Sequence, residues 1–180
     1  RLVGSEMCIR DRMNTEETEI RILEIQDLPI RVSLLNDTDI SRFLNTSEIF
    51  SLEGTTKWFR NRDLSTRADL ALLYMGTVSG MAGITHIDKK AGVGELYIYL
   101  DKKLQGRGLG VTYMGLILDY AFKTLGLNKV FLYTYKTNGR ANHLYEKIGF
   151  VLEGILRQHS WHNGQVCDRC IWGILREEWL

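Results

Sequence analysis

The sequence predicts an α+β domain with a mixed, mostly antiparallel central sheet of about seven strands and about four helices. Three observations predict this class. Strand patterns follow one another in quick succession over residues 69–74, 80–87 and 95–100, with turn residues between them. The apolar period then changes to that of a helix from Gly110, and the chain ends with two strand-like runs joined by His162-Asn163-Gly164. The short connections make the first three of these strands an antiparallel meander.

The elements before the meander are predicted from the single proline, Pro29, onward. Residues 30–35 alternate between apolar and polar as a half-buried strand does, and the polar pair Asn36-Asp37 offers a cap for a helix over 38–46. A second helix is expected within residues 51–62, after a loop at 51–54.

The elements after the meander have stronger signals. From Gly110 to residue 125 the apolar residues fall on one face of a helix of about 15 residues, which Gly126 ends. Residues 129–135 are nearly all β-branched or aromatic and suit a central strand. Asn138 caps a further helix that Gly149 ends, and residues 152–161 and 165–175 form the final hairpin.

Composition and charge exclude several classes of protein. The 180 residues are 44% hydrophobic and 25% charged, which fits one globular domain. With 23 basic and 22 acidic side chains, the net charge of +1 gives no electrostatic indication of nucleic acid or an anionic membrane as partner. No apolar run approaches the roughly 20 residues that span a bilayer, and the start lacks the apolar region of a secretory signal. We therefore expect a cytoplasmic protein with neither partner.

The first residues differ from the rest. Residues 1–12 show no periodicity, resemble a translated adaptor or vector leader, and are followed at once by Met13. We expect residues 1–12 to be a non-native leader, residues 13–29 to lead into the domain, and residues 30–180 to form a single domain.

Cys167 and Cys170 have the C-x-x-C spacing of some zinc and redox sites. A structural zinc site needs four ligands and no second pair is present, and a redox pair would open a helix rather than lie in a strand. The histidines have no metal-ligand spacing either. We expect two ordinary reduced cysteines and no metal.

The segment from Gln105 to Gly110, Q-G-R-G-L-G, carries the main chemical signal and is called the glycine loop below. Its three glycines stand between a strand and a long helix, so the loop can turn tightly and bring backbone N–H groups close to a ligand. Unpaired amides at a helix start favour an anion, most naturally a phosphate. By itself such a loop is about as often only a tight turn at a helix start. A Walker loop fits poorly because no G-K-[ST] follows, and a dinucleotide fingerprint fits poorly because it would open a βαβ unit.

The glycine loop resembles the [RQ]-x-x-G-x-[GA] acetyl-CoA signature of the GNAT superfamily of N-acetyltransferases. Asn138 to Phe150, N-G-R-A-N-H-L-Y-E-K-I-G-F, is similar to the N-x-x-A-x-x-L-Y-x-x-x-G-F segment of the same family. The end of the chain, with Glu153-Gly154 and Arg157, resembles the branch of RimJ/RimL protein, spermidine and amino-sugar acetyltransferases. The resemblance covers about residues 30–180.

The resemblance implies where acetyl-CoA binds. The pyrophosphate would be held by the backbone amides of the loop, with Gln105 bracing the loop and Arg107 adding charge. The pantetheine arm would pass between the fourth and fifth strands, which the family pattern splays apart, and would be lined by Ile98 and Leu100. Asn138 would cap its helix through the side-chain oxygen and would bind the cofactor with the amide group that remains free. The cofactor-binding set implied in this way is Ile98, Leu100, Gln105, Gly106, Arg107, Gly108, Leu109, Gly110, Val111 and Asn138.

Two residues are candidates for the catalytic groups. Tyr145 matches the family tyrosine that donates a proton to the departing thiolate, although periodicity alone would make it a core aromatic. An alkyl ammonium titrates near pH ~10, so a base or a water chain must deprotonate the acceptor. Glu95 is the candidate base, on the same strand face as Tyr97. Some relatives carry the base on the fifth strand, where this chain has Tyr133.

The resemblance implies acetyl transfer to a primary amine of a small molecule, either a polyamine or an amino sugar. A ribosomal-protein N-terminus is the alternative acceptor. A non-catalytic CoA-binding module and a protein that binds another nucleotide also stay open. A homodimer is compatible with the family. For Trp58 and the other large aromatic residues near the expected acceptor side, core packing is favoured over a role in a pocket wall.

Overall fold

The computed structural model describes residues 17–44, 48–162 and 164–180. The expected leader 1–12 and Met13 lie outside these residues. In chain order, the first elements are β1 (Thr18–Ile22), η1 (Ile25–Asp27), α2 (Leu28–Asn36), α3 (Thr38–Ser41), α4 (Leu52–Arg60), β2 (Ala68–Tyr74), β3 (Thr77–Asp88) and β4 (Val93–Leu100). They are followed by η2 (Lys102–Leu104), α5 (Leu109–Asp119), η3 (Tyr120–Thr124), β5 (Lys129–Tyr135), α6 (Gly139–Ile148), β6 (Val151–His162), β7 (Gln165–Leu175) and α7 (Arg176–Trp179).

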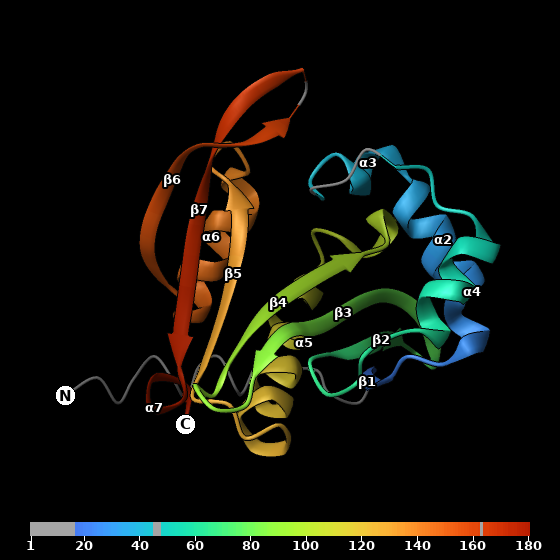
Figure 1. The fold of residues 1–180 in the computed structure, drawn as a ribbon, viewed down its shortest axis with the longest axis horizontal. Helices are drawn as coiled ribbons and strands as arrows, with labels where there is room; N and C mark the ends of the chain where they lie inside the picture. The colour runs from blue at the N-terminus through green and yellow to red at the C-terminus, as the bar shows by residue number, and fades with distance from the viewer. Residues whose placement is uncertain (1–16, 45–47, 163) are drawn as a thin grey trace.

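The seven strands form one mixed sheet in the order β1-β2-β3-β4-β5-β7-β6 (Figure 1). Every neighbouring pair is antiparallel except β4 and β5, which are parallel. The α+β fold class is thereby confirmed, and so is the meander of β2, β3 and β4.

The sheet opens between β4 and β5. These strands pair over only three rungs, from Val93 with Lys129 to Glu95 with Phe131. Beyond that rung β4 continues to Leu100 and β5 to Tyr135 without pairing to each other, and Figure 1 shows the two strands diverging. We call this gap the opening. The predicted splay of strands four and five is confirmed.

Two apolar clusters cover the two faces of the sheet. The larger one joins α5 and α6 to one face, which we call the donor face; Leu96, Met114 and Leu132 are among its members. The second joins α2 and the start of α3 to the other face, with Met81 and Tyr99 from β3 and β4. We call this second face the acceptor face. Figure 1 shows α2, α3 and α4 together on one side of the opening and the β6–β7 hairpin on the other.

The strand predicted over residues 30–35 is wrong. These residues belong to the helix α2, in which Leu28, Leu34 and Leu35 are buried at helical spacing. Pro29 lies in the first turn, where its missing N–H costs no hydrogen bond and its fixed φ suits the helix. The first strand of the sheet is instead β1, which pairs with β2 from within the segment that we expected to lead into the domain.

Several boundaries also differ from the prediction. The described part of the helix expected over 38–46 ends at Ser41, and residues 45–47 lie outside the described residues. The helix α4 begins at Leu52, because the Ser51 hydroxyl accepts the Gly54 amide at 3.0 Å, so most of the expected loop is its first turn. The helix from Gly110 is confirmed, although its last part is a π-helix. With α2 and the short α7, the described residues contain six α-helices where about four were expected.

The strand over 129–135, the helix after Asn138 and the final hairpin are confirmed. Cys167 and Cys170 both lie in β7 as free cysteines. In the part of the chain that the structure describes, no helix is long and apolar enough to cross a membrane.

Candidate active site

The glycine loop connects the end of β4, through η2, to the start of α5. Gly106 and Gly108 both adopt φ of 81°, in the left-handed region that favours glycine, and Gly108 is the N-cap of α5. These two backbone angles turn the chain sharply before the helix. The predicted tight turn at the helix start is therefore present.

The amides of this loop are available to a ligand. Among the described residues, none accepts a hydrogen bond from the backbone N–H groups of residues 106–110. The Val111 amide, in contrast, donates to the Gly108 carbonyl at 3.1 Å. Unpaired amides at the start of a helix of this length form an anion-binding position, so the loop fits a pyrophosphate.

Gln105 and two arginines surround the loop. The Gln105 side chain donates to the Leu100 carbonyl at 3.0 Å, which ties the loop to the end of β4. Its carbonyl oxygen accepts from Arg140 of α6 at 3.2 Å. Arg107 extends towards β2, where its Nη2 donates to the Tyr74 hydroxyl at 3.1 Å and its guanidinium lies 5.1 Å from the ring centre.

Arg140 is a cation of this site that sequence reasoning missed. Its Nη2 lies 3.8 Å from the position that a Cβ on Gly106 would occupy. The sequence could have indicated Arg140 only through its position in the N-G-R-A segment, two residues after Asn138. The family motif allows any residue type at that position. Asn138 itself caps α6, because its Oδ1 accepts the Ala141 amide at 3.2 Å.

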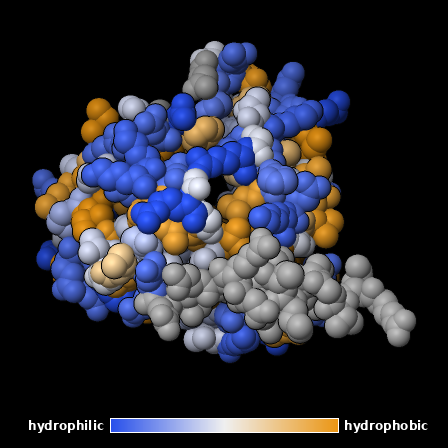
Figure 2. Space-filling model, turned by 180° about the vertical axis from the view of Figure 1, so that it is seen from behind, coloured by the Kyte–Doolittle hydropathy of each residue, from blue (hydrophilic) through white to orange (hydrophobic). Residues whose placement is uncertain are grey.

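The opening is bordered by the unpaired part of β4, which continues to Leu100 and then leads to the glycine loop. Ile98 and Leu100 are half-buried and pack on the donor face. On the side of β4 that faces β5, the backbone beyond Glu95 has no strand partner. An extended chain such as a pantetheine arm can therefore pair with this edge as an added strand would. Seen from behind, the surface is hollowed in this region, between the half built on β4 and the half built on β5 (Figure 2).

Tyr145 lies in α6 on the donor face and is 8% exposed. Its ring packs edge-on against Phe150, with 5.5 Å between the centroids. Burial raises the pKa of its phenol to about 12, so the hydroxyl keeps its proton at neutral pH. Among the described residues none forms a hydrogen bond with this hydroxyl. The side chain is thus both a core aromatic, as its periodicity indicates, and a protonated donor.

Glu95 lies on the acceptor face at the last rung that joins β4 to β5. Its Oε2 is 2.9 Å from Nδ1 of His86, and its side chain is 28% exposed. His86 has a φ of 49° at an irregularity of the β3–β4 ladder, which brings its ring to the carboxylate. A small pocket beside the pair is lined by Thr66, Arg67, Thr85, His86 and Ile87. His86 is exposed, and no local sequence pattern indicated its contact with Glu95.

A buried ionic network centred on Asp69 of β2 lies on the same face of the sheet as Glu95. Oδ2 of Asp69 accepts from Arg62 at 3.0 Å. Oδ1 of the same carboxylate accepts from Nη2 of Arg67 and from the Tyr97 hydroxyl, each at 2.7 Å. Burial opposes ionisation of Asp69, but the hydrogen bonds from Arg67 and Tyr97 outweigh it and hold its pKa below the ordinary value. Burial raises the pKa of Tyr97 well above its usual range.

Tyr133 takes the place on β5 where some relatives have the base. It is half-buried, and its ring stacks on His159 of β6 with 6.4 Å between the centroids. Tyr135 stacks in the same way on His162, at 4.1 Å. The β5 side of the opening is therefore lined on the acceptor face by aromatic rings, whereas the β4 side carries the carboxylate.

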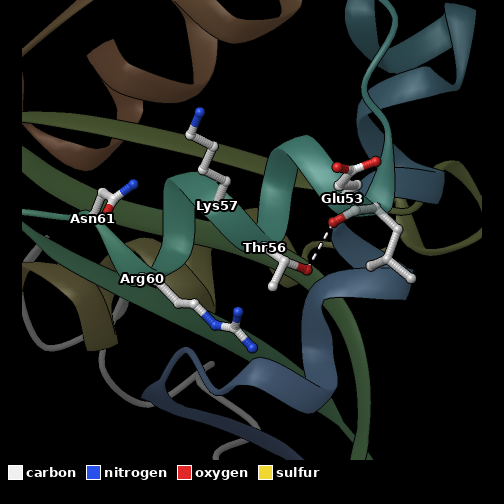
Figure 3. A pocket seen from close by; sticks show the side chains of 6 residues that line it. Glu53, Thr56, Lys57, Arg60 and Asn61 are labelled. Carbon is white, nitrogen blue, oxygen red and sulfur yellow. Dashed lines mark hydrogen bonds between the residues drawn. The ribbon is translucent and has the colours of Figure 1, made fainter.

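A second pocket lies on the outer surface of α4 and has no part in this site. It is lined by Leu52, Glu53, Thr56, Lys57, Arg60 and Asn61. Figure 3 shows the labelled side chains projecting from the solvent side of the helix, with the Thr56 hydroxyl donating to the Leu52 carbonyl at 2.7 Å. No loop amides or catalytic candidates reach this surface.

The fold and the site define a class of protein. A profile described as "Acetyltransferase (GNAT) domain" matches residues 18–151, so the chain belongs to the GNAT acetyltransferase family. The activity is that of an N-acetyltransferase, and the donor used by this family is acetyl-CoA. The match begins at β1, in agreement with the place of that strand in the sheet.

Individual relatives cover nearly the whole chain. Spermidine N(1)-acetyltransferase of Vibrio cholerae is 29% identical, over 93% of this chain and 98% of that protein. A Bacillus subtilis protein, YdaF, whose name proposes a ribosomal N-acetyltransferase, is 27% identical over 91% of this chain and 94% of that protein. The crystal structure of the Vibrio enzyme in complex with CoA and spermine has a TM-score of 0.87 at 25% identity, covering 91% and 98% of the two chains. A dodecameric structure of that enzyme matches with a TM-score of 0.82 at 25% identity, covering 92% and 97%.

Proposed function

We propose that the protein transfers the acetyl group of acetyl-CoA to a primary amine of a small molecule, either a polyamine or an amino sugar. The observation that carries the proposal is the glycine loop, whose unpaired amides stand at the end of β4 where the sheet opens. The pyrophosphate would bind these amides, and the pantetheine arm would follow the unpaired edge of β4 past Ile98.

In this proposal the reacting groups would meet in the opening, between the two faces of the sheet. The thioester would lie near the end of the β4–β5 pairing, where an unpaired backbone N–H of β4 can stabilise the oxyanion of the tetrahedral intermediate. Holding the thioester and the amine together supplies the proximity that a direct transfer requires.

Tyr145 would serve the leaving group from the donor face. Since its pKa is raised to about 12, whereas a thiol titrates near ~8.5, complete proton transfer to the thiolate would be uphill. We therefore propose that the phenol stabilises the departing thiolate mainly through a hydrogen bond, and that solvent supplies the proton afterwards.

Glu95 would take the proton of the acceptor ammonium on the acceptor face. The contact with His86, which is 77% exposed, gives a route by which that proton reaches solvent. Thr85 supports the imidazole, since its hydroxyl lies 3.3 Å from Nδ1 of His86. Some relatives have the base on β5, at the position where this chain has Tyr133. We therefore choose Glu95 of β4 as the candidate base on the two strands that border the opening.

The alternatives differ in their support. The relation to spermidine N-acetyltransferase favours a small-molecule amine, and the similarity to YdaF favours the N-terminus of a ribosomal protein. A non-catalytic CoA-binding module is motivated by Tyr133, which stands where some relatives have the base.

Thiol release from acetyl-CoA tests the proposal. The purified protein is incubated with polyamines, amino sugars and peptides that have a free N-terminus, and acetylated products are identified by mass spectrometry. We expect turnover with a small-molecule amine. Tight binding of acetyl-CoA by calorimetry without turnover of any amine would instead support the non-catalytic module.

We also propose that several copies of this chain assemble, as the dodecameric Vibrio structure supports. Light scattering during size-exclusion chromatography should give a mass that is a multiple of 20.8 kDa. A monomer at micromolar concentration would contradict the proposal.

A further inference from the structure

Within the part of the chain that the structure describes, two arginines on the acceptor face have no counter-ion. Arg31 of α2 contacts the β4 side of the opening, and Arg169 of β7 contacts the β5 side. Across residues 17–44, 48–162 and 164–180, no carboxylate lies within 4.0 Å of either guanidinium. Both residues are half-buried, so water does not fully replace the missing anion.

Arg31 is held in place but has an unused donor. Its Nη1 donates to the Tyr99 hydroxyl at 2.8 Å, and its guanidinium lies 4.3 Å from the centre of the Trp58 ring. Its Nε is buried without a hydrogen-bond acceptor in the described structure. Stacking on an aromatic ring fixes the plane of a guanidinium and leaves its edge available to a planar or tetrahedral anion.

Arg169 is arranged in the same way on the other side. Its guanidinium lies 4.7 Å from the ring centre of Tyr133 and 6.0 Å from that of Tyr135. Its Nε is also buried without an acceptor among the described residues. Strand pairing shows that Arg169 lies on the same face of the sheet as Glu95. Glu95 of β4 is paired with Phe131 of β5, and Tyr135, four residues after Phe131 and therefore on the same face, is paired with Arg169 of β7.

Other charged groups that lie near Glu95 on this face are already engaged. Arg62 and Arg67 both bind Asp69, whose carboxylate is fully buried. Glu95 is in contact with His86. Two half-buried guanidinium groups without a carboxylate partner among the described residues therefore flank the opening, and leaving such charges unpaired is costly unless a ligand supplies the anion.

We propose that the acceptor carries an anionic group, a carboxylate or a phosphate, besides its amine, and that Arg31 and Arg169 bind this group. The proposal rests on the proposed acetyltransferase function and specifies the acceptor among primary amines of small molecules. The pyrophosphate of CoA is not this anion, because the glycine loop leads into α5 on the donor face. A polyamine carries only positive charge and would meet two unpaired cations, so the geometry favours an acidic amino sugar or an amino acid.

Matched pairs of acceptors test the proposal. Lysine differs from cadaverine by one carboxylate, and glucosamine 6-phosphate differs from glucosamine by one phosphate. In at least one pair we expect kcat/KM to be roughly 10- to 100-fold higher for the anionic member, the effect of one charge-assisted hydrogen bond. The pair with the larger ratio identifies the anion as carboxylate or phosphate. Ratios of one or less in both pairs, or a preference for spermidine or for a peptide N-terminus, would overturn the proposal.

Substitutions connect the preference to the two arginines. Arg31→Gln and Arg169→Gln should each bring the preference ratio towards one and raise KM for the anionic acceptor, while KM for acetyl-CoA stays the same. Arg60→Gln, on the outer surface of α4, is the matched control and should leave the ratio unchanged. Circular dichroism verifies folding, and Arg31→Lys and Arg169→Lys replace any glutamine variant that does not fold. An unchanged ratio in all folded variants would refute the role of the arginines.

The acetyltransferase function and the anion site can be tested separately. If acetyl-CoA does not bind in calorimetry and no amine releases thiol, the proposed function is wrong. If amines are acetylated without preference for the anionic members, only the anion site is wrong. Calorimetric titration of glucosamine 6-phosphate and of lysine into the CoA-loaded protein gives a readout independent of turnover, and heat that persists in the double glutamine variant would also contradict the anion site.

Discussion

Replacing Gly108 by alanine isolates the backbone conformation of the glycine loop. Gly108 has a φ of 81°, and a Cβ built on it meets no atom within 4 Å. The substitution therefore adds no steric clash, and its whole cost is the strain of a left-handed alanine, about 1–2 kcal/mol. This strain appears either in stability or in ligand binding, depending on whether the loop keeps its conformation.

The two outcomes have predictable sizes. If the loop keeps its conformation, the folded state carries the strain and Tm falls by roughly 2–8 °C, while acetyl-CoA affinity is unchanged. If the loop relaxes, the amides turn away from the pyrophosphate and the Kd for acetyl-CoA rises about 5- to 30-fold, because 1.4 kcal/mol corresponds to a factor of about ten. The free-energy losses in unfolding and in binding should together amount to about 1–2 kcal/mol.

Thermal unfolding and calorimetry with acetyl-CoA measure both quantities on the same protein. Gly139→Ala is the matched control, because Gly139 also has open space around its Cβ position, lies at the start of α6 and has no positive φ. That variant should lose neither stability nor affinity. If Gly108→Ala changes neither Tm nor Kd, the left-handed loop is not required and the argument for an anion site at α5 is refuted.

Three further predictions follow from the site. Tyr145→Phe should lower kcat about 100-fold with little change in KM for acetyl-CoA, whereas Tyr120→Phe on the nearby η3 should have little effect; steady-state kinetics would contradict the role of the phenol if kcat were unchanged. Glu95→Gln should also lower kcat about 100-fold near pH 7, but the deficit should shrink towards pH ~10, where the amine deprotonates unaided, and a constant deficit across a pH–rate profile would argue against a base. Asp69→Asn should destabilise the fold by about 3–5 kcal/mol in urea unfolding, because it leaves buried cations unpaired. Since the pKa of Asp69 is lowered in the folded state, its contribution is present above the ordinary pKa of 3.8 and is lost as pH falls below it; a wild-type stability curve without this acid loss would contradict the assignment.

The elements that sequence patterns identified correctly are those with local punctuation. Gly126 and Gly149 end their helices with φ of 72° and 111°, which only glycine adopts readily, and Asn138 supplies the cap of α6. The failure over residues 30–35 has a different origin. Six residues that alternate also contain the spacing of a helical face, and what decides between the two is burial against Met81 and Tyr99, from parts of the chain far away in sequence.

The residues of the site fall into the same two groups, those within local motifs and those that only the folded sheet brings together. The glycine loop and Tyr145 lie within short motifs, so their positions followed from the chain itself. The contact of His86 with Glu95 depends on an irregularity in the β3–β4 ladder, and the contact of Arg31 with Tyr99 joins residues 68 positions apart. No local pattern contains such contacts, because they arise only when the sheet has its final register.

The opening in the sheet would allow the two proposed catalytic groups, Tyr145 and Glu95, to act from opposite faces. Glu95 lies on the acceptor face at the last paired rung, whereas Tyr145 belongs to the core of the donor face. In a continuous sheet, hydrogen-bonded backbone would separate them. Because β4 and β5 stop pairing at this rung, a thioester can lie in the gap with its sulfur towards the phenol and its carbonyl carbon towards the amine. In the proposed mechanism, the proton removed from the acceptor and the charge developing on the thiolate would therefore be handled on different sides, and neither group would require the other to change its protonation state.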